Sequence, residues 1–242
     1  MDLKDLKDYL QEKTAIQVSL KGNIFGGLSE DQVEMIAQKV ARLRIKDPWK
    51  GPLSEKTLEG EVAYEQERIN DREWKLFGIL YEGVLYQELL RDFILEGKLN
   101  DRNCTILLTN QLIATRDQDD LRYHIRTSLY GFPHILSIPG FVSAPAKPRE
   151  FYVKRQMGIP VQILKEEYKG RFLDHGDSRT TEVLKGYVMQ ALFFQLTGDP
   201  FCEDQDCRLF NSHWQEEMLH AQLDGKYEFC PRHEAILDKI KS

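Results

Sequence analysis

The chain has 242 residues and a net charge of −6, with 33 Lys and Arg residues against 39 Asp and Glu residues. Because 41% of its residues are hydrophobic, its composition is that of a folded protein rather than a disordered one. Nucleic-acid binding depends on clustered Lys and Arg, and no such block is found here. The sequence has neither an apolar run of roughly 20 residues, which crossing a bilayer requires, nor the apolar core of a signal peptide. We therefore expect a cytoplasmic protein with no nucleic-acid and no membrane partner.

Periodic patterns in the first hundred residues predict helices, a strand and a long loop. Apolar residues at helical spacing predict a short helix over residues 3–10, and alternation over residues 16–20 predicts a strand. Ser29 and Gln32 have the spacing of a capping box, so a helix should follow them and end near Arg44. Residues 47–74 contain two prolines, much charge and little periodicity, so we expect a long surface excursion there. A helix over residues 78–93, ended by Gly97, comes next.

Strand and helix patterns interleave in the rest of the chain. The apolar run at residues 104–108 predicts a buried central strand, and residues 123–129 and 134–138 are further strand candidates. Strand structure should resume at residues 151–153, after an interruption by prolines. Asp177 and Ser178 cap a predicted helix over residues 179–196, which Gly198 and Pro200 end. A second helix over residues 212–223 precedes a C-terminal segment at residues 229–240.

The order of these elements favours an α/β fold, of the α+β kind, over an all-α fold. We expect an N-terminal α/β portion at residues 1–100, which contains the surface excursion at 47–74, and a second portion at 101–242, the two forming one compact unit. The second portion contains a basic stretch, for which a charged strand edge is the usual meaning and an anion or carboxylate site is the alternative. Its cations are Lys147, Arg149, Lys154 and Arg155.

The spacing of cysteine and histidine near the C-terminus predicts a metal site. Cys202 and Cys207 are spaced C-x4-C, and Cys230 and His233 are spaced C-x2-H. Tetrahedral zinc takes such thiolate and imidazole donors, and a closed set of four leaves no open position for a substrate. The predicted zinc is therefore structural. The alternatives are separate buried thiols or a disulfide between Cys202 and Cys207, while Cys104 is expected to be a small core residue.

A second group of metal-binding side chains lies on one predicted helix. His213, Glu217 and His220 are spaced i, i+4 and i+7, which places them on one helix face. Three converging ligands with water as the fourth would suffice for a catalytic metal, and Asp174 or His175 from the preceding loop could add to them. Capping of the following helix is the simpler role for those two residues. An active zinc hydrolase, with a relocated metal site on this helix face, is the alternative function that the sequence leaves open.

A resemblance to the archaemetzincins rests on the same cysteines. Phe201-Cys202, the C-x4-C spacing and the later Phe229-Cys230-x-x-His233 resemble the C-terminal half of that family. There, a zincin helix with the motif H-E-x-x-H-x-x-G-x-x-H runs into a cysteine, and further cysteines build a structural zinc site. Residues 109–112, 122–124 and 144–150 also look like an archaeal family catalogued as metallopeptidases. The resemblance implies a metzincin-like fold, with a mixed, twisted sheet, flanking helices and a C-terminal structural zinc site.

At the catalytic positions the chain departs from the archaemetzincin motif. If Cys202 is lined up with the family's first cysteine, Gly198 falls on the motif glycine and Leu192 on its glutamate. The three histidine positions are then held by Ala191, Gln195 and Phe201. Alanine and phenylalanine offer no ligand atom, glutamine is a poor zinc ligand, and leucine cannot take a proton from zinc-bound water. The resemblance therefore implies a pseudoenzyme that lacks peptidase activity, keeps a structural zinc, and binds a peptide or protein partner or acts as a scaffold.

Overall fold

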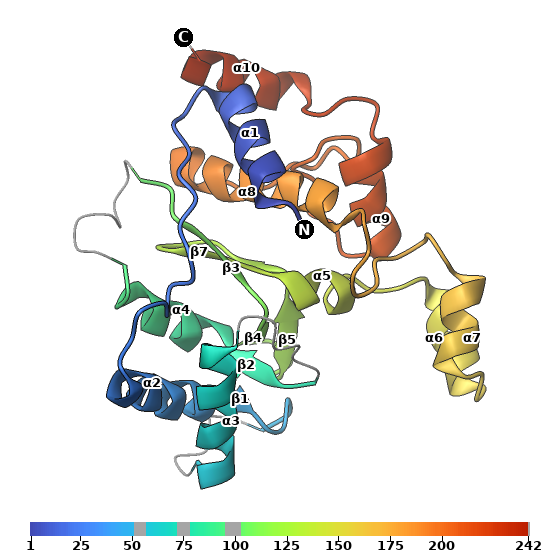
Figure 1. Cartoon of the computed structure of the whole chain (residues 1–242). Coiled ribbons are helices and arrows are strands. Elements are labelled where there is room, and N and C mark those ends of the chain that lie inside the picture. Colours follow the sequence, from blue (N-terminus) through green and yellow to red (C-terminus); the bar gives the residue numbers. More distant parts are fainter. Residues whose placement is uncertain (51–56, 72–77, 95–102, 242) are drawn as a thin grey trace. The chain divides into compact units, whose positions relative to one another are not determined.

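The computed structural model describes residues 1–50, 57–71, 78–94 and 103–241 (Figure 1). These residues fall into two compact units. The central unit is Lys21–Gly140, and the terminal unit combines Met1–Leu20 with Phe141–Ser242. Each unit contains residues from before and from after residue 100.

Two small mixed sheets lie in the central unit. One has the order β1-β2-β4-β5, made of Arg44–Ile45, Leu80–Glu82, Leu112–Arg116 and Tyr123–Arg126. In it β2 and β4 are parallel, and the other neighbours are antiparallel. The other sheet has the order β3-β7-β6, made of Ile106–Thr109, His134–Ser137 and Ser128–Leu129, with β3 parallel to β7. Together with the helices, these sheets confirm the predicted mixed α+β class.

Helices α2 (Glu30–Arg42), α3 (Glu59–Asn70) and α4 (Gly83–Arg91) complete the central unit. The predicted capping box begins α2: Ser29 N donates to Gln32 Oε1 at 2.9 Å, and Gln32 N donates to Ser29 Oγ at 3.3 Å. The apolar stripe of α2 packs in a core with residues of the other helices and of both sheets. The most buried members of this core include Ile36, Val40, Tyr81, Ile113 and Ile135.

Several expectations for the central unit are wrong in detail. Residues 47–74 are not only a surface excursion, because they contain α3, whose Ile69 is part of the core. The predicted helix at 78–93 begins only at Gly83: the preceding residues form β2, and the Glu82 carboxylate accepts from Leu85 N at 2.6 Å as the helix cap. Strand β4 was not predicted. Gly97 lies outside the described residues.

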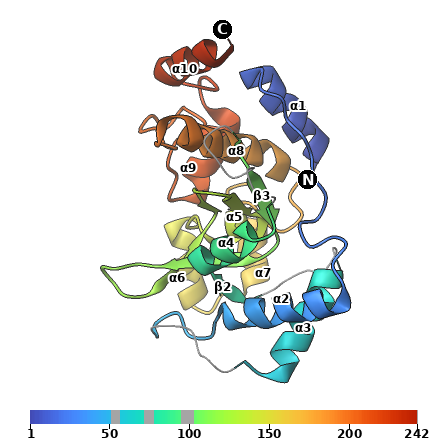
Figure 2. The same cartoon turned by 90° about the vertical axis from the view of Figure 1, so that its left-hand side faces the viewer.

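In the terminal unit, the long helix α8 (Thr180–Thr197, Figure 2) has ten of its 18 residues buried. It is the helix predicted at 179–196, and Gly198 ends it in the left-handed conformation, with a φ of 78°. Helix α1 (Leu3–Thr14) packs against both α8 and α10 (Pro231–Lys241). Its Lys13 pairs with Glu228 at 2.5 Å, and its Asp5 pairs with Lys185 of α8 at 3.1 Å.

The remaining helices of the described residues are α5 (Ile138–Ser143), α6 (Arg149–Gln156), α7 (Val161–Glu167) and α9 (Gln215–Leu219), which continues into the π-helical turn η1 (His220–Asp224). The strand expected at residues 151–153 is wrong, because this stretch lies inside α6 and buries Phe151. The strand expected at residues 16–20 is also wrong. Ile16 and Leu20 are exposed, and no described strand pairs with this segment to satisfy its backbone groups.

A carboxylate on α8 gives the terminal unit an acid-sensitive contact. Glu182 pairs with Lys185 at 2.8 Å and with Arg208. Burial tends to raise the pKa of Glu182, but the hydrogen bonds from Lys185 and Arg208 outweigh it and hold the pKa below its ordinary value. A depressed pKa means that the contact stabilises the fold above the unfolded-state pKa, and that this contribution is lost as the pH falls through the folded-state value.

We expect Glu182→Gln to lower the free energy of unfolding by less than about 1 kcal/mol at neutral pH, since the carboxylate is partly exposed and screened. At a pH below the folded-state pKa the two proteins should be equally stable. Urea unfolding at several pH values measures this difference. A difference that stays constant down to the acid limit would contradict the assignment of the shift to these ion pairs.

Candidate metal centre and other polar sites

The first half of the predicted metal site is the loop that follows α8. Within this loop, Asp204 N donates to Cys202 Sγ at 3.4 Å, and Cys207 N donates to the Asp204 carbonyl at 3.0 Å. Asp206 N donates to Asp204 Oδ1 at 3.1 Å. These local bonds turn the chain sharply, so both sulfurs of the C-x4-C pair lie on the same side of the loop. Backbone N–H groups directed at a sulfur also favour its thiolate form.

The second half comes from the start of α10. Pro231 occupies the first position of this helix, where a missing N–H costs nothing. His233 N donates to the Cys230 carbonyl at 2.9 Å, so the chain is already helical between the two residues. This turn brings His233 Nδ1 to 3.0 Å from Cys230 Sγ. The C-x2-H spacing therefore corresponds to one helical turn, which brings the two donor atoms together.

The structure brings the four predicted ligands together. One ligand atom from each of Cys202, Cys207, Cys230 and His233 lies within 4.8 Å of all the others. Cys202 Sγ is 3.8 Å from Cys230 Sγ, and Cys207 Sγ is 3.7 Å from His233 Nδ1. A tetrahedral zinc, with Zn–S bonds of about 2.3 Å and a Zn–N bond of about 2.0 Å, holds its donors about 3.5–3.8 Å apart. These two distances fit zinc, and the 3.0 Å separation at Cys230 and His233 is shorter.

No disulfide joins the described cysteines, so the disulfide alternative between Cys202 and Cys207 is wrong in this structure. Cys207, Cys230 and His233 are buried, and Cys202 is partly buried. The fourth cysteine, Cys104, lies elsewhere, is half-buried and has its thiol pKa raised to about 12 by burial. The predicted role of Cys104 as a small packing residue fits this setting, because burial makes a thiol unreactive.

Burial governs the protonation of the cluster. It raises the pKa of Cys207 to about 12 and raises the pKa of Cys202, and it lowers the pKa of His233 below its ordinary value. The protein alone therefore favours neutral thiols and a neutral imidazole. A neutral imidazole is already the form that ligates a metal, whereas the thiols must lose protons to do so. A metal bound by these residues would displace the thiol protons, so its affinity would increase as the pH rises.

Side chains outside the ligand set hold the cluster in place. The ring of Phe193, on α8, packs edge-on against the His233 imidazole, with centroids 5.1 Å apart. Asp206, next to Cys207, accepts from Lys226 Nζ at 3.0 Å and contacts His220 Nε2 at 2.8 Å. These contacts join the ligand loop to η1 and to the segment after it. They fix the ring orientation and the loop position that the four donors need.

The backbone at Gly225 packs directly against the backbone of Asp206 in the ligand loop. A Cβ on Gly225 would lie 2.5 Å from the carbonyl oxygen of Asp206, which cannot move without shifting Cys207. We therefore expect Gly225→Ala to destabilise the protein by about 1–3 kcal/mol and to weaken metal retention. Thermal unfolding and competition with a zinc chelator measure the two effects. Gly60→Ala is the matched control, because a Cβ there meets nothing within 4 Å; equal behaviour of the two variants would contradict the role given to Gly225.

The residues at the archaemetzincin motif positions lie on or after α8 and do not form a metal site. Ala191 and Leu192 are buried, with 0% and 6% exposure, in the packed face of the helix. Gln195 follows Ala191 by one turn, and Phe201 lies in the loop just before Cys202; both are partly buried. Three of these four side chains carry no donor atom. At the three positions where the resemblance would place histidine ligands, the chain therefore has two hydrocarbon side chains, Ala191 and Phe201, and the amide of Gln195.

The alternative metal site is not assembled in this structure. Glu217 Oε2 accepts from His213 N at 2.9 Å and from Trp214 N at 3.0 Å, so its carboxylate caps α9. His220 contacts Asp206 instead, and Asp174 pairs with Lys165 at 2.6 Å. Within the described ranges, the Cys3His cluster is the one group that brings three or more Cys, His, Asp or Glu ligand atoms together. The relocated site stays a prediction.

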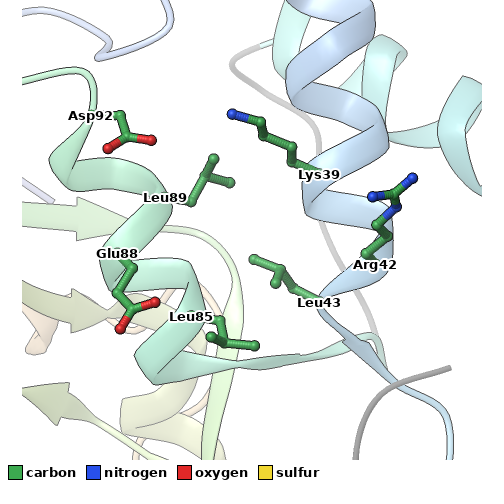
Figure 3. A pocket seen from close by; sticks show the side chains of 7 residues that line it. All are labelled: Lys39, Arg42, Leu43, Leu85, Glu88, Leu89 and Asp92. Carbon is green, nitrogen blue, oxygen red and sulfur yellow. The ribbon is translucent and has the colours of Figure 1, made fainter. Parts of the chain in front are cut away.

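The central unit has a shallow pocket of about 470 Å³ between α2 and α4 (Figure 3). Its floor is made of Leu43, Leu85 and Leu89, and Lys39 faces Asp92 across it. Arg42 and Glu88 complete the lining. Two cations on α2 thus balance the carboxylates of Glu88, on α4, and of Asp92, just after it, so the lining has no net charge.

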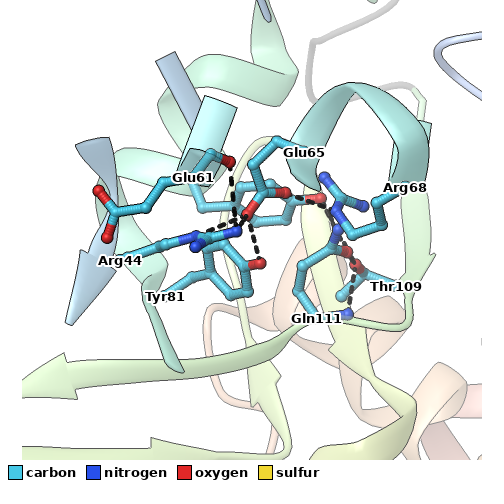
Figure 4. Close-up of polar contacts among 8 residues, drawn as sticks. Arg44, Glu61, Glu65, Arg68, Tyr81, Thr109 and Gln111 are labelled. Atoms are coloured by element: carbon cyan, nitrogen blue, oxygen red, sulfur yellow. Dashed lines mark hydrogen bonds and ion pairs between the residues drawn. The ribbon is translucent and has the colours of Figure 1, made fainter. Parts of the chain in front are cut away.

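The same unit contains a buried charged network that no sequence pattern predicts (Figure 4). Glu65, on α3, is completely buried, and its Oε1 accepts from Arg44 Nη2 at 2.6 Å and from the Tyr81 hydroxyl at 2.7 Å. Its Oε2 accepts from Arg68 Nε at 2.6 Å. The Gln111 amide continues the network when its oxygen accepts from Arg68 and its nitrogen faces Thr109 and Tyr86. A charged residue on a helix normally indicates a solvent-exposed face, so no local signal marks Glu65 as buried.

The chain can be assigned to a known protein family. A mixed α+β fold with a C-terminal cluster of three cysteines and a histidine describes a protein equipped to hold a metal ion. Residues 1–240 match the model of the family described as "Probable metallopeptidase family (DUF6775)", and the chain belongs to this family. Searches of curated proteins and of solved structures gave no match. In the described part of the chain, no helix combines the length and the apolarity that crossing a membrane demands.

Proposed function

We propose that this member of the metallopeptidase family is an archaemetzincin-like protein that holds one structural zinc and has no peptidase activity. In this proposal it acts by binding a peptide or protein, or as a scaffold. The observation that carries the proposal is the closed donor set: three sulfurs and one imidazole nitrogen within 4.8 Å of one another. A zinc with four protein ligands has no position left for the water or substrate that peptide hydrolysis needs.

The chemistry of these donors fits zinc well. Thiolate and imidazole are preferred by zinc over magnesium or calcium, which take oxygen ligands. Zinc bound here supplies folding energy, because it ties the loop after α8 to the start of α10. Cys202, Cys207, Cys230 and His233 would hold it. Phe193 and Asp206 orient the cluster without touching the ion.

The lack of catalytic groups on α8 supports the second half of the proposal. A zincin needs two histidines one helical turn apart, with a glutamate beside the first. Ala191 and Leu192 are packed into the interior, so they provide neither a ligand nor a general base. A cytoplasmic location belongs to the same proposal and has the support of the sequence alone.

A peptidase assay tests the proposal directly. The purified zinc-loaded protein is incubated with a broad mixture of fluorogenic peptides, with and without a chelator, and its zinc content is measured in parallel. We expect no chelator-sensitive cleavage. Chelator-sensitive cleavage by the unmodified protein, at a rate that scales with zinc content, would overturn the proposal.

His220→Ala separates this proposal from the relocated hydrolase. We expect the variant to keep the zinc content of the unmodified protein, because His220 contacts Asp206 and none of the four ligands is changed. His213→Ala is prepared in parallel, because His213 belongs to the same relocated ligand set although it precedes α9. Loss of one metal and of peptide cleavage in both His220→Ala and His213→Ala would establish the relocated site instead.

A variant with the zincin motif restored tests independently whether α8 occupies the place of a zincin helix. Introducing Ala191→His, Leu192→Glu, Gln195→His and Phe201→His together rebuilds the zincin pattern. If α8 occupies the place of a zincin helix, the variant should bind a second zinc. Because Ala191 and Leu192 are buried, overpacking can destabilise this variant, so the peptidase assay on the unmodified protein remains the deciding test.

A further inference from the structure

Helices α6 and α7 form a hairpin with a small core of its own. Phe151, Leu164, Tyr168 and Phe172 are buried together, and the rings of Phe151 and Phe172 meet edge-on with centroids 5.6 Å apart. Residues 158–160 make the turn between the helices. The hairpin thus encloses Phe151, Tyr168 and Phe172, whereas Tyr152 of α6 stays 40% exposed.

The closed end of the hairpin nevertheless exposes large aliphatic side chains. Met157 is 76% exposed, Ile163 is 57% exposed and Val153 is 48% exposed. We call these three residues the apolar tip. Met157 N donates to the Val153 carbonyl at 3.0 Å, and Ile163 N donates to the Pro160 carbonyl at 3.1 Å, so all three lie within one helical turn of the bend. Exposed apolar side chains gathered in this way mark a contact surface.

The hairpin and its flanking residues carry an excess of cations, and Arg149 lies one helical turn before Val153 on α6. Between residues 147 and 171 the chain has seven Lys and Arg residues and three Glu residues, although the whole protein is acidic. Lys154 pairs with Glu167, and Lys165 pairs with Asp174. Arg149 and Arg155, by contrast, are both exposed on α6 and have no ion pair with a carboxylate of a described residue. The hairpin therefore presents free guanidinium groups beside exposed hydrocarbon.

We propose that the α6–α7 hairpin docks on an anionic lipid surface, with the apolar tip inserted at the headgroup level and Arg149 and Arg155 against the lipid phosphates. Segments that bind at a membrane interface typically combine apolar side chains with flanking Arg and Lys residues. Nucleic acid is disfavoured, because the apolar tip is aliphatic and cannot stack on bases. Tyr152, an exposed aromatic residue of α6, is held by its hydroxyl, which accepts from Lys147 N at 3.0 Å.

The proposal goes beyond the structural zinc and stands independently of it. The sequence expectation of no membrane partner rested on the missing spanning segment, and a hairpin tip needs none. The basic stretch that was expected at a strand edge is instead part of a helix, which exposes both of its free arginines. At physiological salt the Debye length is about 8 Å, so the acidic rest of the protein repels the lipid surface only weakly.

Vesicle co-sedimentation of the full chain tests the proposal. We expect binding to vesicles of phosphatidylcholine mixed with phosphatidylglycerol, and little binding to phosphatidylcholine alone. Met157→Glu should weaken binding about tenfold, because it both removes hydrocarbon and adds a repelled charge. Met35→Glu is the matched control: Met35 is 49% exposed on α2, and the substitution changes the net charge equally. Replacing Arg149 and Arg155 together by Gln should weaken binding to the anionic vesicles alone.

Three outcomes would overturn the proposal. They are no binding to anionic vesicles at low salt, equal loss of binding in Met157→Glu and Met35→Glu, and binding to single-stranded DNA without binding to vesicles. Each variant changes an exposed side chain, so unchanged circular dichroism and unchanged zinc content establish that the fold is intact. Failure of this proposal leaves the peptidase and zinc measurements unaffected.

Discussion

Replacing Cys230 by serine is expected to abolish zinc retention and to unfold the helical segment that begins at Pro231. Cys230 Sγ lies 3.8 Å from Cys202 Sγ and 3.0 Å from His233 Nδ1, so it joins both halves of the cluster. Structural zinc sites in small domains contribute on the order of 10 kcal/mol of binding free energy, which is folding free energy where the site forms only in the folded state. We therefore expect the largest loss of stability of any single substitution at this site.

Zinc content and thermal unfolding of Cys230→Ser measure this effect. Cys104→Ser is the matched control, because Cys104 is the one cysteine outside the cluster, so the variant should keep its zinc. Adding a chelator to the unmodified protein should reproduce the behaviour of Cys230→Ser. If Cys230→Ser and Cys104→Ser lowered the melting temperature equally while both kept their metal, the cluster would not be a zinc site.

Replacing Glu65 by alanine is expected to destabilise the central unit by about 3–5 kcal/mol. The substitution leaves Arg44 and Arg68 facing each other without the carboxylate that both contact, at 2.6 Å in each case. It also removes the acceptor of the buried Tyr81 hydroxyl. Because side chains cover this cluster, water cannot replace the lost partner, and the penalty is that of an uncompensated buried charge.

Urea unfolding of Glu65→Ala and of two companions checks the network. Glu67→Ala changes an exposed glutamate of the same helix and should alter the free energy of unfolding by less than about 0.5 kcal/mol. Tyr81→Phe removes one hydrogen bond and should have an intermediate effect of about 1 kcal/mol. A similar stability of Glu65→Ala and Glu67→Ala would mean that the network is not buried in solution.

Features encoded by neighbouring residues could be predicted from the sequence. The capping box at Ser29 begins α2 as expected, and Gly198 ends α8 as expected, because each acts within one turn of its helix. The clustering of the four proposed metal ligands belongs to the same class. Each pair of ligands is local, and the spacing within each pair already specifies the turn that directs its donors to one point.

Features that depend on distant partners could not be predicted. The sequence of β2 has the pattern of a helix start, and it is the pairing with β4 that makes it a strand. Its Tyr81 is buried by elements that come before and after it in the sequence. The charged sequence of α6 resembles a strand edge. In the structure its buried residue, Phe151, packs against α7 and the loop after it, and not against a sheet. Glu65 looks like a surface residue, since its partners Arg44 and Tyr81 come from other elements.

The zinc content of the purified, unmodified protein is the most direct test of the structural metal centre. Elemental analysis, with His220→Ala prepared in parallel, should give one zinc per chain in both proteins, as expected for a single closed cluster of four ligands. Two metals per chain, with one lost in His220→Ala, would contradict the account and point to a second, catalytic site. Absence of zinc from protein purified without chelator would contradict it as well.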